Sequence, residues 1–429
     1  MHLSLAQYFR DRSGNFATTT ALLALPLLGT IGMAVDVGYA IEQRAALLAA
    51  ADAAAIGALS TQSVGVLAAI SSSQNGKITI AEADARKLFQ GQLPSGMVTK
   101  LTDLSIDITK EDDTMNAVVS FQAQVPTSFL RLLSHDTINV SGTATATYNT
   151  GTFMDFYMLL DNTPSMGVGA TMADIEMMER HTSDTCAFAC HDESKSYDYY
   201  DLAKDLGVSM RIDVVREAVQ QLTYSATKAA RYPSQYRMGI YTFGTSAKDT
   251  KLTEISTLSS DMNAVRTSAN AIDLMSIPYQ NYNHDQATDL DNAFKNLSTI
   301  IKKGGSGKNM TDPEKVIFFV SDGLTDSSKG SSCTKKTTGT RCQEPIDYSV
   351  CEPLKKKGIK IAALYTTYLP LPQNAWYNNW IKPFQSEIAD RMRSCASPGL
   401  YFEVSPTEGI TEAMEALFQK VIGTPRLAS

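Results

Sequence analysis

The sequence predicts an α/β fold, a doubly wound and mainly parallel sheet, preceded by a transmembrane helix and a small α+β module. Three patterns predict it. Residues 13–35 form an uncharged apolar run, and residues 78–147 alternate apolar and polar side chains. From residue 151 to 429, apolar strand-like runs alternate with helical segments. Residues 1–12 are then a cytoplasmic N-terminus, and residues 36–150 comprise a helix and the module.

The composition excludes several classes of protein. The chain has 429 residues, of which 43% are hydrophobic and 19% charged, so it can bury a core and should not be largely disordered. The net charge of -7 argues against a nucleic-acid-binding protein, which usually presents a basic face. We therefore expect no nucleic-acid partner.

The apolar run from Ser13 to Val35 has the length of a membrane span at about 1.5 Å per residue. Arg10 and Arg12 precede it and Asp36 follows it, which predicts that the N-terminus is cytoplasmic and that the bulk of the protein lies on the other side of the membrane. The alternative is a cleaved signal peptide. The span is long for one, and helix-forming residues continue without a break through residues 39–59.

The middle segment reads as a small α+β module. A helix is predicted over 81–93, and a short helix over 127–133. Alternating, β-branched stretches predict three antiparallel strands over residues 104–108, 116–125 and 137–148. No chemistry-bearing cluster occurs in these residues, so we expect a scaffold or spacer.

The C-terminal domain should contain a parallel sheet covered by helices on both faces. The predicted strands are the apolar runs over residues 153–160, 236–243, 315–322 and 359–368. The predicted helices cover residues 212–229, 261–272, 289–302 and 411–421. Ligands of such sheets bind at the carboxyl ends of the strands, where two of these strands end in an aspartate.

These aspartates belong to a candidate metal site. The first strand runs into Asp161, followed at alternate positions by Thr163 and Ser165, and the third ends at Asp322. Thr288 offers a further hydroxyl at the start of a helix. Carboxylate and hydroxyl oxygens with open water positions favour Mg²⁺, with Ca²⁺ or Mn²⁺ as alternatives.

Six cysteines, none before position 186, predict disulfides in an oxidising compartment. Fifteen pairings are open, and the sequence does not choose among them. Local pairing would join Cys186 to Cys190 and Cys333 to Cys342, leaving Cys351 with Cys395.

Cys186 and Cys190 have a second interpretation, because His181 and His191 flank them and the four could bind zinc. A disulfide is favoured for an exported loop. The polar, tyrosine-bearing segment 167–206 reads as a loop insertion beside the metal loop, and residues 333–351 read as another.

The candidate metal-site residues resemble a known kind of metal site. The set Asp161-x-Thr163-x-Ser165, Thr288 and Asp322 resembles the metal-ion-dependent adhesion site of von Willebrand factor A domains, which have a Rossmann-like fold. The resemblance covers residues 152–422, with threonine at position 163 where the family more often has serine. It implies that these five residues hold Mg²⁺, directly or through water, and that an acidic group on a partner completes the coordination. A metal-free A domain is the alternative.

The N-terminal segment from RDRSGNFATTT to AAAIGAL resembles the start of TadG-like proteins of tight-adherence (Tad/Flp) pilus systems. Those proteins combine an inner-membrane anchor and a pseudopilin-like segment with a C-terminal A domain. The resemblance implies that other pilus-assembly components are partners. A processed pseudopilin would carry glutamate at the fifth position after the cleavage glycine, whereas Gly14 is followed there by Thr19.

We therefore expect a non-enzymatic pilus assembly or adhesion factor that binds a protein partner through its metal. One alternative is a structural pilus component with a passive A domain. A metal-dependent hydrolase is a further alternative, but Thr163 stands where an Asp-x-Asp phosphatase has its second acid, and no replacement nucleophile is evident.

Overall fold

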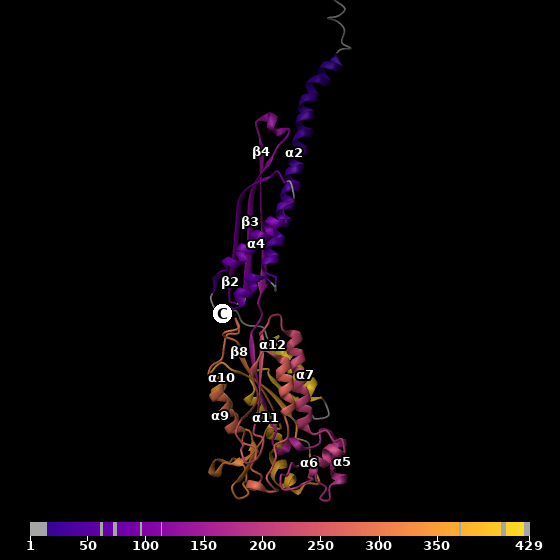
Figure 1. Cartoon of the computed structure of the whole chain (residues 1–429), viewed down its shortest axis with the longest axis vertical. Helices are drawn as coiled ribbons and strands as arrows, with labels where there is room; N and C mark the ends of the chain where they lie inside the picture. Colours follow the sequence, from indigo (N-terminus) through magenta and orange to yellow (C-terminus); the bar gives the residue numbers. More distant parts are fainter. Residues whose placement is uncertain are drawn as a thin grey trace, which may run out of the picture. The chain divides into compact units, whose positions relative to one another are not determined.

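The computed structural model describes residues 15–60, 63–71, 75–94, 97–112, 114–368, 370–404 and 409–423. The predicted cytoplasmic residues 1–12, Ser13 and the glycine of the prepilin comparison, Gly14, lie outside this range. The chain divides into two compact units, one up to Gly151 and one from Thr152 (Figure 1), and each is described by itself.

The first unit is a long helix packed on an antiparallel sheet. Helix α2 (Asn15–Ala58) runs without interruption from the predicted span into the predicted helix that follows it, and it is long and apolar enough to cross a membrane. The sheet has the order β1-β2-β3-β4. The other elements are α3 (Val64–Ser71), β1 (Gly76–Lys77), α4 (Thr79–Gly91), β2 (Lys100–Glu111), β3 (Thr114–Pro126) and β4 (Thr137–Asn149). The three strands and the helix predicted here are confirmed.

Small side chains let α2 lie close to this sheet. The buried positions of its C-terminal half recur every three or four residues, as a single helix face requires, and are Leu47, Ala50, Ala51, Ala54, Ala55 and Ala58. Alternate residues of β3 face the helix, from Met115 to Val125. The short helix predicted over 127–133 is confirmed in part, as the 3-10 helix η1 (Leu130–Leu133) that connects β3 to β4.

The second unit contains a six-stranded sheet in the order β12-β11-β8-β5-β6-β7. All neighbours are parallel except β6 and β7, which are antiparallel. The strands are β5 (Met154–Leu160), β6 (Tyr236–Thr242), β7 (Thr253–Ser259), β8 (Glu314–Ser321), β11 (Lys360–Thr366) and β12 (Tyr401–Val404). The mainly parallel, doubly wound sheet is thus confirmed.

Helices cover both faces of this sheet. Phe156, Met158 and Leu160 of β5 pack in one core with α7 (Arg211–Ala229), α8 (Met262–Ser268) and α12 (Ile410–Ile422). Tyr157 and Leu159 point to the opposite core, with α9 (Leu290–Ile300), α10 (Glu352–Lys356) and α11 (Gln385–Cys395). Burial on both faces explains why the central strands are continuous apolar runs.

Several elements were not predicted. The insertion after the metal loop contains α5 (Met172–His181) and α6 (Tyr199–Asp205), each begun by a capping box, so it is not a simple loop. The segment from Cys333 to Cys351 is not a loop insertion either, because it contributes β10 (Arg341–Pro345), which pairs with β9 (Leu324–Ser328).

Two of the three cysteine pairings are confirmed. Cys333 is bonded to Cys342 and Cys351 to Cys395. The predicted Cys186–Cys190 bond is wrong, since both are free thiols. The two thiols hydrogen-bond each other, and Cys186 Sγ also donates to the Phe188 carbonyl at 3.7 Å.

Candidate metal site at the carboxyl edge of the sheet

The loop after β5 turns its side chains toward one another. Asp161 Oδ1 accepts hydrogen bonds from the Thr163 amide at 3.0 Å and from the Thr163 hydroxyl at 2.7 Å. The Thr163 and Ser165 hydroxyl oxygens are 3.4 Å apart. Asp161 and Thr163 are fully buried and Ser165 is partly exposed, so the loop brings one carboxylate and two hydroxyls together at the end of β5.

The end of the neighbouring strand β8 contributes the second carboxylate. Ser321 Oγ donates to Asp161 Oδ2 at 2.6 Å, which links the ends of β8 and β5. Asp322, the next residue, is fully buried, and its Oδ1 accepts from the Leu324 amide at 3.1 Å. Its Oδ2 is buried without a hydrogen-bond partner among the described residues. Such an atom is costly unless a positive charge lies near it.

Thr288 lies on the wall of a cavity of about 490 Å³ that Ser165 also lines. The backbone of Thr288 exchanges two hydrogen bonds with that of Asp326, at 3.0 and 2.8 Å, just past the end of β8. The next residue, Asp289, caps α9 by accepting from the Asn292 amide at 2.9 Å. Four of the predicted residues are thus linked through Asp161 and its neighbours, and the fifth shares a cavity wall with Ser165.

The two aspartates oppose each other's ionisation. Burial, and then the charge of Asp322, raise the pKa of Asp161 from 3.8 to about 7. Burial also raises the pKa of Asp322, an effect that Arg211 and the Ser165 hydroxyl partly offset. Without a further positive charge, each of the two buried carboxyls therefore holds its proton more tightly than an exposed aspartate does.

Arg211, which the sequence analysis missed, provides part of the compensation. It is the first residue of α7, it is 1% exposed, and its Nη1 lies 3.9 Å from Asp322 Oδ2. Burial lowers the pKa of this guanidinium, while Asp322 acts in the opposite direction. Tyr368 lies under it, with the ring centre 5.6 Å from Cζ. One cation thus faces two carboxylates.

Asn162 was also not predicted to be part of the site. Its Nδ2 donates to the Gly244 carbonyl at 2.7 Å, and its Oδ1 accepts from the Phe243 amide at 3.0 Å. It thereby ties the loop after β5 to the end of β6. A fully bonded side chain of this kind fixes loop geometry without contacting a ligand.

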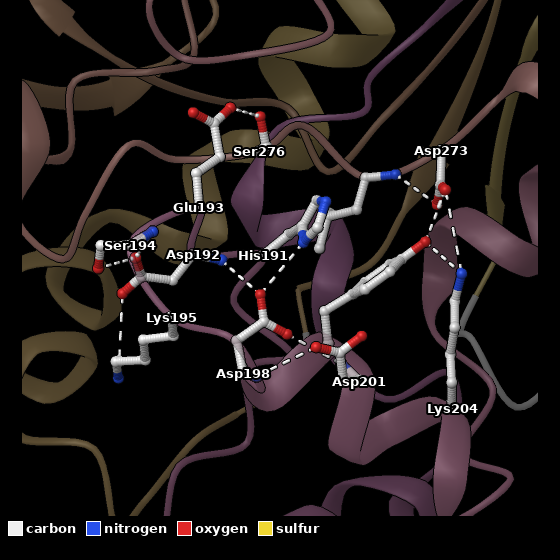
Figure 2. A network of polar contacts seen from close by, with 12 residues as sticks. His191, Asp192, Glu193, Ser194, Lys195, Asp198, Asp201, Lys204, Asp273 and Ser276 are labelled. Carbon is white, nitrogen blue, oxygen red and sulfur yellow. Dashed lines mark hydrogen bonds and ion pairs between the residues drawn. The ribbon is translucent and has the colours of Figure 1, made fainter.

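A polar network holds the insertion in place (Figure 2). Asp198, at the start of α6, accepts from the Asp192 amide at 2.6 Å, and its carboxylate lies 3.1 Å from His191 Nδ1. Ser276 donates to Glu193 at 2.6 Å, which joins the insertion to the loop preceding Thr288. The insertion is therefore a fixed part of the site's surroundings.

The zinc interpretation is not supported by these positions. His191 is turned to Asp198, and His181 Nδ1 lies 2.8 Å from the Met177 carbonyl in its own helix. Within the described ranges, His181, Cys186, Cys190 and His191 do not bring their ligand atoms together as a group of three or more.

The comparisons with known proteins concern both units. Residues 14–62 match the family described as "Putative Flp pilus-assembly TadE/G-like". No curated protein matches the chain. Among solved structures, the vWF domain of the type V pili tip protein Mfa5 from Porphyromonas gingivalis is 10% identical, with a TM-score of 0.38, over 65% of this chain and 98% of that one. The PilB minor pilin from Streptococcus sanguinis is 12% identical, with a TM-score of 0.35, over 76% and 77%.

The family match falls on the helix that is long and apolar enough to cross a membrane. It associates the chain with pilus assembly or adhesion and indicates a single-pass membrane anchor. The mainly parallel sheet of the second unit and the helices on both of its faces match the predicted doubly wound α/β architecture. The chain thus carries a TadE/G-like Flp pilus-assembly segment over residues 14–62 and, after it, the doubly wound, mainly parallel α/β domain that the A-domain resemblance predicts.

Proposed function

We propose that the A domain binds an acidic group on a protein partner through a divalent cation, and that this binding serves Flp pilus assembly or adhesion. The partner would be another pilus component or a surface to which the pilus attaches. The proposed role is binding rather than catalysis. The N-terminal helix would hold the chain in the inner membrane, with its N-terminus in the cytoplasm and the A domain outside.

One observation carries the proposal: two fully buried carboxylates lie at neighbouring strand ends, and one arginine is the only cation that the described contacts give them. Asp322 Oδ2 accepts no hydrogen bond among the described contacts, and its counter-charge is the Arg211 guanidinium at 3.9 Å. Two aspartates and three hydroxyls would form an all-oxygen donor set, which suits Mg²⁺ and also Ca²⁺ or Mn²⁺.

The five residues would provide two kinds of oxygen ligand to the cation. Asp161 and Asp322 would supply negative charge, and the hydroxyls of Thr163, Ser165 and Thr288 would supply neutral oxygens. When bound, the cation would provide a positive centre that attracts a partner's carboxylate. Ser165 and Thr288 line the cavity through which that carboxylate would approach.

Cation affinity should fall as the pH is lowered through 7. Asp161 must lose its proton to act as a ligand, and its pKa in the metal-free site is about 7. We expect the Mg²⁺ dissociation constant to rise roughly tenfold per pH unit below this value and to level off above it. Titrations at pH 5.5, 6.5, 7.5 and 8.5 measure this, and an affinity that does not change across that range contradicts it.

Arg211 favours a second candidate function, a structural A domain that needs no metal. Its guanidinium already faces Asp322. In that case the chain would support the pilus through its helix and first unit, and partner binding would be indifferent to EDTA.

The metal-bridged and the structural function can be distinguished in cells whose original chain is replaced by the Asp161→Ala variant. We expect loss of Flp-dependent adherence, with the variant present in the membrane at normal amounts. The matched control is Asp289→Ala, which removes a neighbouring helix cap from outside the proposed ligand set and should keep adherence. Normal adherence by Asp161→Ala would contradict metal-bridged binding and favour the structural role.

A further inference from the structure

The turn that joins β3 to β4 is an ordered apolar projection. We define the β3–β4 tip as residues 127–136. Thr127 closes it, since its amide donates to the Asp136 carbonyl at 3.0 Å and its hydroxyl to the His135 carbonyl at 2.5 Å. Three of its four large apolar side chains are nevertheless exposed, Phe129 by 47%, Leu132 by 83% and Leu133 by 58%, while Leu130 is half-buried.

Asp36 attaches this tip to α2. Its carboxylate accepts hydrogen bonds from three successive backbone amides of the tip, those of Ser128, Phe129 and Leu130, at 2.9, 2.8 and 2.6 Å. Asp36 is 5% exposed, so its charge is satisfied by the tip and withdrawn from the surroundings. The charge that ends the apolar run in the sequence is therefore not presented on the helix surface.

Gly32, one turn earlier, allows the contact. A Cβ at this position would lie 2.6 Å from Phe129 Cβ, so a larger residue would displace the tip. Gly32, Asp36 and Ala40 are buried, while the residues between them are exposed. They form one narrow stripe at a spacing of four residues, and the tip packs at the level of Gly32 and Asp36.

The tip lies beside the apolar part of α2 (Figure 1). Exposed large apolar side chains continue along the helix past Asp36 and are Leu22, Leu23, Leu27, Leu28, Ile31, Met33, Val35, Val37, Tyr39 and Ile41. From Leu22 to Ile41 the helix rises about 30 Å, the thickness of a bilayer's hydrocarbon core. The tip joins α2 at positions 32–36, inside that stretch.

We propose that the β3–β4 tip is a second membrane contact, which inserts Phe129, Leu132 and Leu133 into the bilayer beside α2. The bilayer surface that covers α2 at Asp36 also reaches the tip, because three hydrogen bonds hold the two together. Arg131, exposed on the same turn, can extend its head to the lipid phosphates while its stem lies along the apolar layer. This contact is independent of the proposed metal site.

Tryptophan fluorescence in nanodiscs tests the contact on the full chain. Leu132→Trp and Leu133→Trp place a reporter on the tip at exposed positions, so neither should disturb the fold. Val118→Trp is the matched control, because Val118 is 38% exposed on β3 and about 30 Å along the strand from the tip. The unsubstituted chain gives the background of Trp376 and Trp380.

In discs made with brominated phosphatidylcholine, we expect the added emission at positions 132 and 133 to fall at least twofold, with no change at position 118. Aqueous iodide should quench only the control. Tip reporters that iodide quenches and brominated lipid does not would overturn the proposal. The tip would then stand in water, where another pilus component could cover it.

Discussion

Replacement of Asp161 by asparagine is expected to abolish the stabilisation of the A domain by Mg²⁺ and to raise the stability of the metal-free protein. The amide keeps an oxygen for Thr163 and removes one of two buried like charges. Burial gives Asp161 a raised pKa, so the folded state holds its proton more tightly than the unfolded state does. The aspartate therefore destabilises the metal-free fold increasingly as the pH rises from about 4 to 7.

At pH 8 the metal-free Asp161→Asn variant should exceed the unsubstituted chain by roughly 2–4 kcal/mol in free energy of unfolding. At pH 4.5 the difference should largely vanish. Saturating Mg²⁺, at 100 times its dissociation constant, should add about 2.7 kcal/mol to the unsubstituted chain and nothing to the variant. Denaturant unfolding of the second unit measures all three quantities.

Asp155→Asn is the matched control on the same strand. Asp155 is also buried, at the opposite end of β5, but it is paired with Arg237 at 2.7 and 2.8 Å. Its replacement should lower stability by about 1–3 kcal/mol and leave the Mg²⁺ effect intact. An Asp161→Asn protein that Mg²⁺ still stabilises would show that the cation binds elsewhere.

Replacement of Arg211 by methionine should destabilise the metal-free protein by about 3–5 kcal/mol. Methionine fills the space of the side chain stem but leaves Asp322 as a buried charge without its cation. The loss should shrink when Asp322→Asn is added, because the charge then disappears. It should also shrink in Mg²⁺, since the ion replaces the missing positive charge, and Mg²⁺ should bind Arg211→Met more tightly than the unsubstituted chain.

Arg216→Met provides the comparison within α7. Arg216 is 21% exposed and pairs with Asp213 at the surface of the same helix, so its loss should cost about 1 kcal/mol or less. Equal losses for the two arginines, or a loss at Arg211 that neither Mg²⁺ nor Asp322→Asn reduces, would mean that Arg211 acts by packing alone.

The parts of the fold that were predictable from the sequence are those with the strongest burial pattern. Strands β5, β8 and β11 are buried on both faces and therefore appear as continuous apolar runs. Strand β7 was missed because it is an edge strand with the sequence TEISTLS, whose side chains are mostly polar and partly exposed. The insertion was read as a loop because α5 and α6 are short and begin with polar capping residues.

The proposed ligands could be named because they follow strand ends at recognisable spacings. Arg211 could not, since nothing in SMRIDVV distinguishes a buried arginine from a solvated one at the start of an amphipathic helix. The role of Arg211 depends on Asp322, which lies 111 positions further along the chain, and therefore on the tertiary fold. The Cys186–Cys190 error has a similar origin: a short spacing brings two thiols together without fixing whether they form a bond.

The most direct test of the proposed metal-dependent role is a calorimetric titration of Mg²⁺ into the full chain in nanodiscs at pH 7.5, with Asp161→Asn alongside. We expect saturable binding at one site per chain and no binding by the variant. A correctly folded, unsubstituted chain that binds neither Mg²⁺, Ca²⁺ nor Mn²⁺ would contradict the account. The A-domain fold would stand, and Arg211 would remain as the cation of the site.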